Sequence, residues 1–163
     1  MSPYKIRPIT DGDIPFLWEM LYQSLYVKEG EKPFDRIILQ EPDIAKYAAD
    51  WGRKGDLGFI AVNAEGQPIG SITIRTFTGT NKGFGYVSDE VPEIGMAILP
   101  SYRGMGIGSA LLQQLFNELR VRKINRVSLS VDPLNTAAVK LYIRYGFKEV
   151  ETVGTSVTMV AEV

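Results

Sequence analysis

Glycine is concentrated between residues 103 and 109, where the sequence reads Arg-Gly-Met-Gly-Ile-Gly-Ser. An apolar pattern with helical spacing begins directly afterwards, so this run stands at the entry to a helix. A helix N-terminus has unpaired backbone N–H groups and a partial positive charge, and it binds phosphate readily. Glycines leave that backbone open to an anion, and Arg103 could add a charge-assisted contact. The run predicts either an anion site or simply a tight helix entry.

Two common phosphate motifs do not fit this run. A dinucleotide site needs glycine-x-glycine-x-x-glycine early in a β-α-β unit. Here Leu111 stands where the third glycine belongs, and the run lies late in the chain. A P-loop needs Gly-Lys-Ser or Gly-Lys-Thr, and no such triplet follows. Both motifs are therefore excluded.

The chain contains neither cysteine nor histidine. Disulfides, thiol nucleophiles and cysteine zinc sites are therefore excluded, and no metal site is expected. A Ser-His-Asp or Cys-His centre is excluded as well, because histidine is the usual general base. Acid–base chemistry must come from carboxylates, tyrosines, lysines or water.

The elements that would position these groups follow from periodicity and turn residues. In the first half we expect a strand over 4–9 and a helix over 14–25, which Asp11 or Asp13 would cap. An irregular segment over 28–41 and a helix over 43–53 should follow. Strands over 57–62 and 69–77 should form a hairpin, with a loop over 78–92 after it. In the second half we expect strands over 93–99, 126–131, 147–153 and 156–162, with helices after the glycine run and after 135. Asn135 suits the N-cap of the last helix, and Gly146 suits its left-handed C-terminal end.

The bulk properties are those of an ordinary globular protein. The 163 residues are 45% hydrophobic and carry a net charge of -1, so we expect one domain over 1–163 with helices on both faces of a sheet. The small net charge gives no footprint for nucleic acid or for an anionic membrane. No stretch approaches the roughly 18 apolar residues of a membrane span, and no secretory signal is visible. A cytoplasmic location is the expectation.

Two segments resemble one known family. Arg103-Gly104-Met105-Gly106-Ile107-Gly108 resembles the Arg/Gln-x-x-Gly-x-Gly/Ala signature of the GNAT superfamily of acyl-CoA N-acyltransferases. The run from Asn135 to Phe147, with Leu141-Tyr142 and Gly146-Phe147, is similar to the family's Asn…Ala…Leu-Tyr-x-x-x-Gly-Phe block. The segments stand in the family's order with a strand between them. Motif-level similarity covers about 93–150, and the order of elements covers nearly the whole chain.

The resemblance implies a fold and a cofactor. The fold would be an α/β (α+β) GNAT-like domain whose central sheet is mixed and mostly antiparallel, with the fourth and fifth strands parallel and splayed. Acetyl-CoA would lie in the splay as co-substrate, its pantetheine amides paired with the backbone at Ala97, Ile98 and Leu99. One N–H group there would polarise the thioester carbonyl. The diphosphate would be held by Arg103, Gly104, Met105, Gly106, Ile107, Gly108 and Ser109, and the cofactor arm would touch Asn135 and Tyr142.

The resemblance also implies catalytic roles. Tyr142 matches the family tyrosine that protonates the departing thiolate, and its alternative role is a core tyrosine. The general base is often a glutamate on one of the splayed strands. Glu93 starts the earlier strand, where its alternative role is a solvated carboxylate at a strand end. On the later strand Ser130 stands where some peptide N-terminal acetyltransferases have glutamate, a departure from their mechanism. Asp132, Asp89 and Glu90 are weaker candidates, more simply explained as surface charges.

The expected activity is transfer of an acetyl group from acetyl-CoA to a primary amine of a small molecule or peptide, by direct attack without a covalent enzyme intermediate. One alternative is a non-catalytic CoA-binding or regulatory domain of the same fold, and another is a structural domain with a glycine-rich turn. The acceptor wall would come from 21–51 and 78–92, which contain aromatic residues and mixed charges but no dominant acidic cluster. Edge strands near the C-terminus could pair in a homodimer.

Overall fold

The structure, a computed structural model of the protein, describes residues 3–163. Its strands are β1 (Tyr4–Pro8), β2 (Leu57–Asn63), β3 (Pro68–Arg75), β4 (Glu93–Ile98), β5 (Arg126–Val131), β6 (Lys148–Val153) and β7 (Ser156–Glu162). Its α-helices are α1 (Ile14–Ser24), α2 (Pro42–Ala45), α3 (Ile107–Val121) and α4 (Thr136–Arg144). Short 3-10 turns cover Asp11–Asp13, Arg36–Gln40 and Pro100–Tyr102. Apart from α2, the bounds agree with the sequence expectations to within a few residues.

The strands of the described residues form a seven-stranded sheet in the order β1-β2-β3-β4-β5-β7-β6. Every neighbouring pair is antiparallel except β4 and β5, which are parallel. The expected hairpin of β2 and β3 is confirmed. The prediction of a mixed, mostly antiparallel sheet is confirmed too. Since β6 lies at one edge, pairing with a second copy there stays a prediction.

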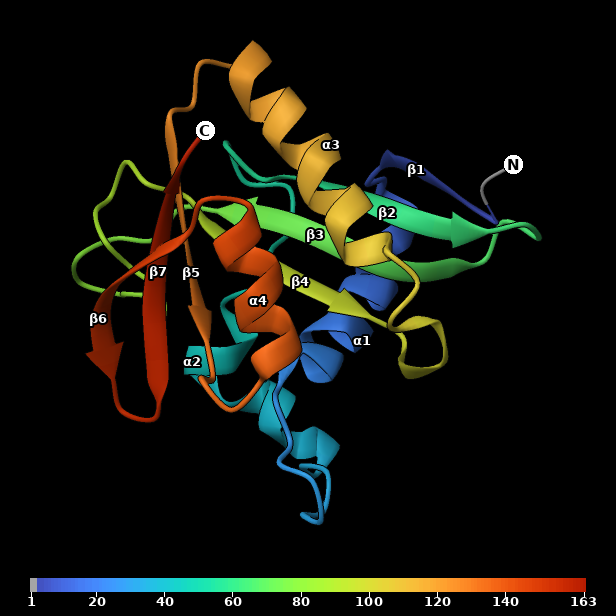
Figure 1. The fold of residues 1–163 in the computed structure, drawn as a ribbon, viewed down its shortest axis with the longest axis horizontal. Coiled ribbons are helices and arrows are strands. Elements are labelled where there is room, and N and C mark those ends of the chain that lie inside the picture. Colours follow the sequence, from blue (N-terminus) through green and yellow to red (C-terminus); the bar gives the residue numbers. More distant parts are fainter. Residues whose placement is uncertain (1–2) are drawn as a thin grey trace.

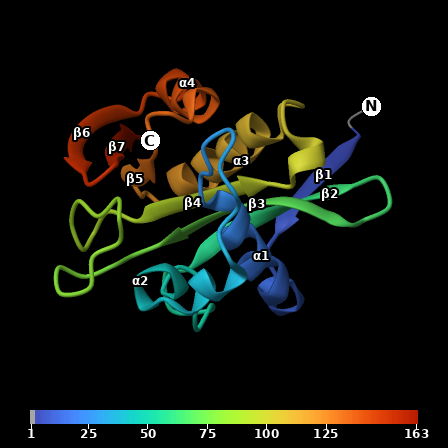
Figure 2. The same cartoon turned by 90° about the horizontal axis from the view of Figure 1, so that it is seen from below.

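Helices cover both faces of the sheet, as expected. Figure 2 shows α1 and α2 on one face and α3 and α4 on the other. The apolar side of α3 packs against the middle strands, where Leu111, Leu112, Leu115 and Leu119 are completely buried. This spacing of three and four residues, repeated along the helix, explains why the segment folds as a helix on the sheet. No helix within residues 3–163 is long and apolar enough to cross a membrane.

The parallel strands β4 and β5 meet at one point and then separate. Their register holds a single pair, Glu93 with Ser128, supported by a hydrogen bond of 3.0 Å from the Ser128 N–H to the Pro92 carbonyl. Beyond it the two strands run in different directions (Figure 1). The backbone of the second half of β4 therefore has an unpaired edge, which was the expectation for splayed strands.

The second helix is shorter than predicted. Helical spacing predicted 43–53, but α2 ends at Ala45 and turns follow. The buried guanidinium of Arg75 donates to the carbonyls of Lys46 (2.8 Å) and Ala49 (2.6 Å). Those carbonyls are oriented toward the sheet instead of continuing an α-helical ladder. Asp50 then adopts a left-handed conformation with φ of 57°. The prediction of a long helix was wrong because a side chain on β3 takes the carbonyls.

The predicted cap of α1 also differs in detail. Asp13 occupies the N-cap position, but its side chain makes no capping hydrogen bond to this helix. Its carboxylate instead accepts from the Thr10 N–H (2.7 Å) and forms an ion pair with Arg7 (2.7 Å). Asp13 therefore fixes the 3-10 turn before the helix and joins it to β1. Asp11 makes no capping bond either, so the sequence located the helix start but not the contacts that hold it.

Candidate active site

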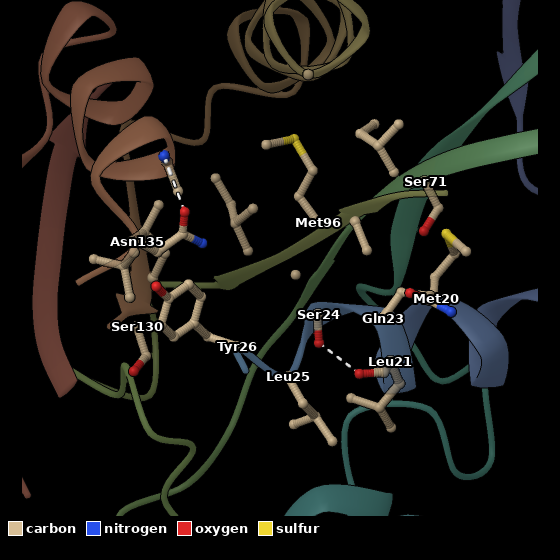
Figure 3. A pocket seen from close by; sticks show the side chains of 18 of the residues that line it. Met20, Leu21, Gln23, Ser24, Leu25, Tyr26, Ser71, Met96, Ser130 and Asn135 are labelled. Carbon is tan, nitrogen blue, oxygen red and sulfur yellow. Dashed lines mark hydrogen bonds between the residues drawn. The ribbon is translucent and has the colours of Figure 1, made fainter. Parts of the chain in front are cut away.

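A cavity of about 1000 Å³ opens where β4 and β5 separate, and it reaches both faces of the sheet. Its wall is formed by α1, the segment between α1 and α2, the inward side of β3 and β4, the glycine turn, the end of β5 and α4. Figure 3 shows side chains from α1 and its following loop directed toward this space, with Met96 on β4 and Asn135 before α4 on other sides. The expected site residues that line it are Glu93, Ala97, Ile98, Arg103, Gly104, Gly106, Ile107, Gly108, Ser109, Asn135 and Tyr142.

The glycine turn has the conformation that an anion site requires. Gly104 and Gly106 have φ angles of 77° and 82°, which disfavour other residues, and Gly106 is the N-cap of α3. At Gly108 an added Cβ would lie 3.2 Å from Leu141, so glycine allows α3 and α4 to approach closely. The N–H groups of Ile107, Gly108 and Ser109 belong to the first turn of α3 and have no acceptor within the helix. These donors beside the cavity fit a diphosphate.

The side chains of three residues in or beside the turn, Arg103, Met105 and Ser109, contact other parts of the protein or solvent. Arg103 donates from Nε to the Ile98 carbonyl (3.1 Å) and from Nη2 to the Gln23 carbonyl (3.5 Å), so its guanidinium links β4 to the end of α1. The Ser109 hydroxyl lies 2.6 Å from the Tyr145 hydroxyl. Met105 is 52% exposed and is not part of the cavity wall. The contribution of these side chains to cofactor binding stays a prediction.

The backbone of β4 presents alternate residues to the open edge. The Leu99 N–H donates to the Ile69 carbonyl on β3 (2.8 Å), whereas the Pro92 carbonyl accepts from β5. The backbone N–H and C=O groups of successive residues point to opposite sides of a strand. Those of Ala97 and Leu99 therefore point toward β3, while those of Met96 and Ile98 point toward the gap between β4 and β5. Of the three predicted backbone partners, Ile98 therefore has the right orientation. Met96 has it too, and the sequence reasoning missed it for lack of a register.

Glu93 is a buried carboxylate in the cavity wall, with only 4% of its surface exposed. Its Oε2 accepts from the Tyr47 hydroxyl (2.5 Å), and its Oε1 accepts from the Gly85 N–H (3.1 Å). Burial raises the pKa of Glu93 to about 7, although both hydrogen bonds and the charge of Lys46 act in the opposite direction. The alternative of a solvated carboxylate at a strand end is therefore wrong. A carboxylate with this pKa can accept a proton near neutral pH.

Tyr47 and the loop before β4 hold Glu93 in place. The Tyr47 hydroxyl also accepts from the Phe84 N–H (2.6 Å), and the two rings are stacked 6.2 Å apart. An added Cβ on Gly83 would lie 2.3 Å from Glu93 Oε1, and one on Gly85 would lie 2.6 Å from the Leu129 backbone. The sequence showed a glycine-rich loop here, and those glycines were the available signal. Nothing in the sequence pointed to Tyr47, which lies 46 residues away from Glu93.

Tyr142 lies on α4 with its ring packed against Phe147, at 5.6 Å between centroids. It belongs to the core and also lines the cavity, so both interpretations of this residue describe part of its position. Burial alone raises the pKa of Tyr142 to about 12, and its hydroxyl has no hydrogen-bond partner within residues 3–163. The hydroxyl therefore keeps its proton at neutral pH and is free to donate it.

The remaining polar candidates have mainly structural contacts. Asn135 caps α4 by accepting from the Ala138 N–H (3.4 Å), which leaves its amide nitrogen unused. Asp132 accepts from the Leu134 N–H (2.9 Å), and Asp89 accepts from the Gly79 N–H (3.0 Å). Ser130 lines the cavity near Tyr26 (Figure 3). The Tyr26 hydroxyl donates to the Leu134 carbonyl (3.3 Å), which joins the segment after α1 to the segment before α4. Glu93 is thus the carboxylate best placed for base chemistry.

Comparison with known proteins agrees with this fold. The model of the acetyltransferase (GNAT) family matches residues 16–147. An uncharacterized N-acetyltransferase of Methanocaldococcus jannaschii is 28% identical, over all of this chain and 69% of its own length. An N-alpha-acetyltransferase of Sulfurisphaera tokodaii is 31% identical, over 72% of each chain. The solved structure of the PaiA N-acetyltransferase from Thermoplasma acidophilum in complex with coenzyme A superposes with a TM-score of 0.66 over the whole of both chains, at 21% identity.

The opening between β4 and β5 and the glycine turn beside it lie within the residues that the acetyltransferase family model matches. The chain belongs to the GNAT family of acetyltransferases.

Proposed function

We propose that this protein transfers an acetyl group from acetyl-CoA to a primary amine. The observation that carries the proposal is the shared cavity, which joins the free N–H groups at the start of α3 to a buried carboxylate, Glu93, and to a buried tyrosine, Tyr142. An anion site alone would fit many ligands. An anion site combined with one base and one acid fits transfer between a phosphate-bearing thioester and an amine.

Acetyl-CoA supplies the acetyl group as a thioester. In the reaction, a bond forms between the amine nitrogen and the acetyl carbonyl carbon, and the carbon–sulfur bond breaks with its electron pair remaining on sulfur. Glu93 accepts the proton that the ammonium group loses before attack, and returns it to solvent. Tyr142 donates a proton to the sulfur and regains one from the acylated nitrogen. The products are an amide, a thiol and one released proton, and the protein returns to its starting state.

The relatives support a primary amine without fixing its source. The matched Sulfurisphaera tokodaii protein is called an N-alpha-acetyltransferase. The matched Thermoplasma acidophilum structure contains coenzyme A, which supports CoA as the ligand of the glycine turn. The acceptor is therefore a small-molecule amine or a peptide N-terminus.

The proposal is tested by titrating the protein with acetyl-CoA in a calorimeter and by detecting acetylated amines by mass spectrometry. Binding together with acetylation supports the function. Binding without acetylation of any amine would assign the protein to the non-catalytic alternative, and no binding at millimolar acetyl-CoA would exclude both.

Tyr142→Phe should lower kcat at least about tenfold and leave the Kd for acetyl-CoA nearly unchanged, because only the donated proton is lost. Tyr86→Phe is the matched control, since Tyr86 does not line the cavity. Wild-type turnover by Tyr142→Phe would show that the tyrosine is a packing residue and that another group protonates the sulfur.

A further inference from the structure

The half of the cavity that faces α1 and α2 is almost free of charge. Its floor is formed by small side chains of β3 and β4, namely Ser71, Thr73, Gly95 and Ala97. Its walls are mainly apolar and include Leu21, Leu25, Ile38, Ile44, Trp51 and Phe84. Of the described residues that line the cavity, the charged ones are Glu93, Arg103, Asp132 and Arg144. Asp132 and Arg144 belong to the end of β5 and to α4. Arg103 reaches the end of α1, but its guanidinium donates to the carbonyls of Ile98 (3.1 Å) and Gln23 (3.5 Å) beside the expected diphosphate site. Glu93 is therefore the carboxylate on this side.

The charged side chains that border this half are already paired. Arg36 forms an ion pair with Glu19 at 2.7 Å, on the outer side of α1. Lys46 contacts Asp43, Asn81 and the Lys82 carbonyl. The buried Arg75 pairs with Asp56 at 2.7 Å and also donates to two backbone carbonyls. None of these three cations is free to receive a carboxylate from a bound molecule.

This distribution of charge selects among amines. An ammonium group beside Glu93 meets the one carboxylate present. A second ammonium group would enter surroundings of uncharged side chains with no second anion, and a carboxylate would enter them with no free cation. Both groups would lose hydration without gaining a charged partner. An apolar or aromatic body instead gains from leaving water, and the stacked Tyr47 and Phe84 rings offer it a flat surface.

We infer that the acceptor is a monocationic amine with an apolar body, aromatic bodies included, and that zwitterionic amino acids and polyamines are poor substrates. The inference rests on the proposed function and names the substrate class of the same site. A peptide N-terminus with an uncharged, apolar first residue also belongs to this class.

A matched set of amines tests the inference. Phenethylamine and phenylalaninamide carry one positive charge, phenylalanine adds a carboxylate to the same body, and spermidine adds further ammonium groups. With saturating acetyl-CoA, kcat/KM for phenethylamine and phenylalaninamide should exceed the values for phenylalanine and spermidine at least about tenfold. Titration of the protein saturated with coenzyme A should likewise give binding of phenethylamine and much weaker binding of phenylalanine.

A variant pair tests the charge argument directly. Ile38 lines the cavity, whereas its neighbour Ile37, on the same 3-10 turn, is 62% exposed and does not. Ile38→Arg should lower kcat/KM for phenethylamine at least about tenfold, because the new cation repels the ammonium group. It should also lower the ratio of kcat/KM for phenethylamine to kcat/KM for phenylalanine, because the cation attracts the carboxylate of phenylalanine. Ile37→Arg should leave both values unchanged. Melting temperatures establish that the two variants are folded.

The outcomes separate the two proposals. Faster acetylation of phenylalanine or spermidine than of phenethylamine would overturn the substrate class and leave acetyl transfer standing. If Ile38→Arg behaves like Ile37→Arg, the uncharged wall does not select the substrate. If acetyl-CoA binds and no amine of any class is acetylated, both the substrate class and the proposed function fail.

Discussion

Glu93 is buried, and its carboxylate accepts hydrogen bonds from two neutral donors, the Tyr47 hydroxyl and the Gly85 N–H. Burial raises its pKa from 4.5 to about 7, because the charged form loses more hydration than the two hydrogen bonds return. The same desolvation that makes the residue costly for folding makes it a base that is half ionised near neutral pH. Tyr142 shows the complementary case, since burial raises its pKa to about 12 and keeps it protonated.

The raised pKa of Glu93 predicts the pH profile. The residue is active as a base when it is deprotonated, so kcat/KM should rise with pH through about 7 and level off above it. Glu93→Gln should lower kcat/KM about 100-fold or more and abolish this rise. Steady-state rates between pH 5.5 and 9 measure both effects. An unchanged rise in the variant would mean that another group titrates.

Tyr47 should determine where that rise occurs. Its hydroxyl hydrogen bond lowers the pKa of Glu93, so Tyr47→Phe removes a contact that favours the carboxylate. The midpoint of the rise should therefore move to higher pH, and the plateau rate should fall less than in Glu93→Gln. A purely structural role would lower the plateau without moving the midpoint. The pH profile thus distinguishes positioning of the base from support of the fold.

At the scale of elements, the turn before α3 and the separation of β4 from β5 matter together. The turn exposes the first N–H groups of a helix, and the separation gives a ligand access to them and to the backbone of β4. Neither element would form this cavity alone. The turn without the gap would be an anion site on a surface, and the gap without the turn would be an apolar opening in a sheet.

Gly106→Asp should weaken acetyl-CoA binding at least about tenfold, because it adds a negative side chain at the N-cap that faces the diphosphate site. Gly66→Asp is the matched control. Gly66 has a similar φ of 79° in the turn between β2 and β3, outside the cavity, so it carries the same backbone strain. Calorimetry on both variants measures the difference. Equal loss of affinity would show that strain, and not the site, is responsible.

At the scale of the whole molecule, the sequence predicted the order of strands and helices because these depend on local periodicity and turn chemistry. The hairpin of β2 and β3 and the helix that follows the glycine turn are examples. It failed where a distant side chain decides the outcome, as when Arg75 takes the carbonyls after α2. The contact between Tyr47 and Glu93 was beyond prediction for the same reason. Glu93 itself was predicted, but its burial depends on a loop whose position only the fold determines.

The ion pair between Asp13 and Arg7, at the junction of β1 and α1, should stabilise the fold at neutral pH and lose this effect in acid. Hydrogen bonding to Arg7 lowers the pKa of Asp13 from 3.8 to about 2 in the folded state. The stabilisation is therefore fully present above about pH 4 and is lost as the pH falls toward 2. Asp13→Asn should lower the free energy of unfolding by about 1–2 kcal/mol at pH 7, a value reduced for the exposure of Arg7.

Urea unfolding of wild-type protein and Asp13→Asn at several pH values measures this contribution. The difference between the two proteins should shrink between pH 4 and pH 2, because the wild-type carboxyl group is then protonated as well. A difference that does not depend on pH would show that Asp13 acts through its packing and not through its charge.

The segment Gly83-Phe84-Gly85 is a loop by secondary structure, but its two glycines are buried and its backbone is held by contacts, while the Phe84 side chain is 43% exposed. Its N–H groups bind Tyr47 and Glu93, the Phe84 carbonyl accepts from Thr158 on β7, and neither glycine has room for a Cβ. Loops usually tolerate insertions and sequence drift better than the elements they connect. Here the tolerance should be confined to the outer residues of the loop, and new acceptor specificities should evolve by changes around this segment while its length and its two glycines stay fixed.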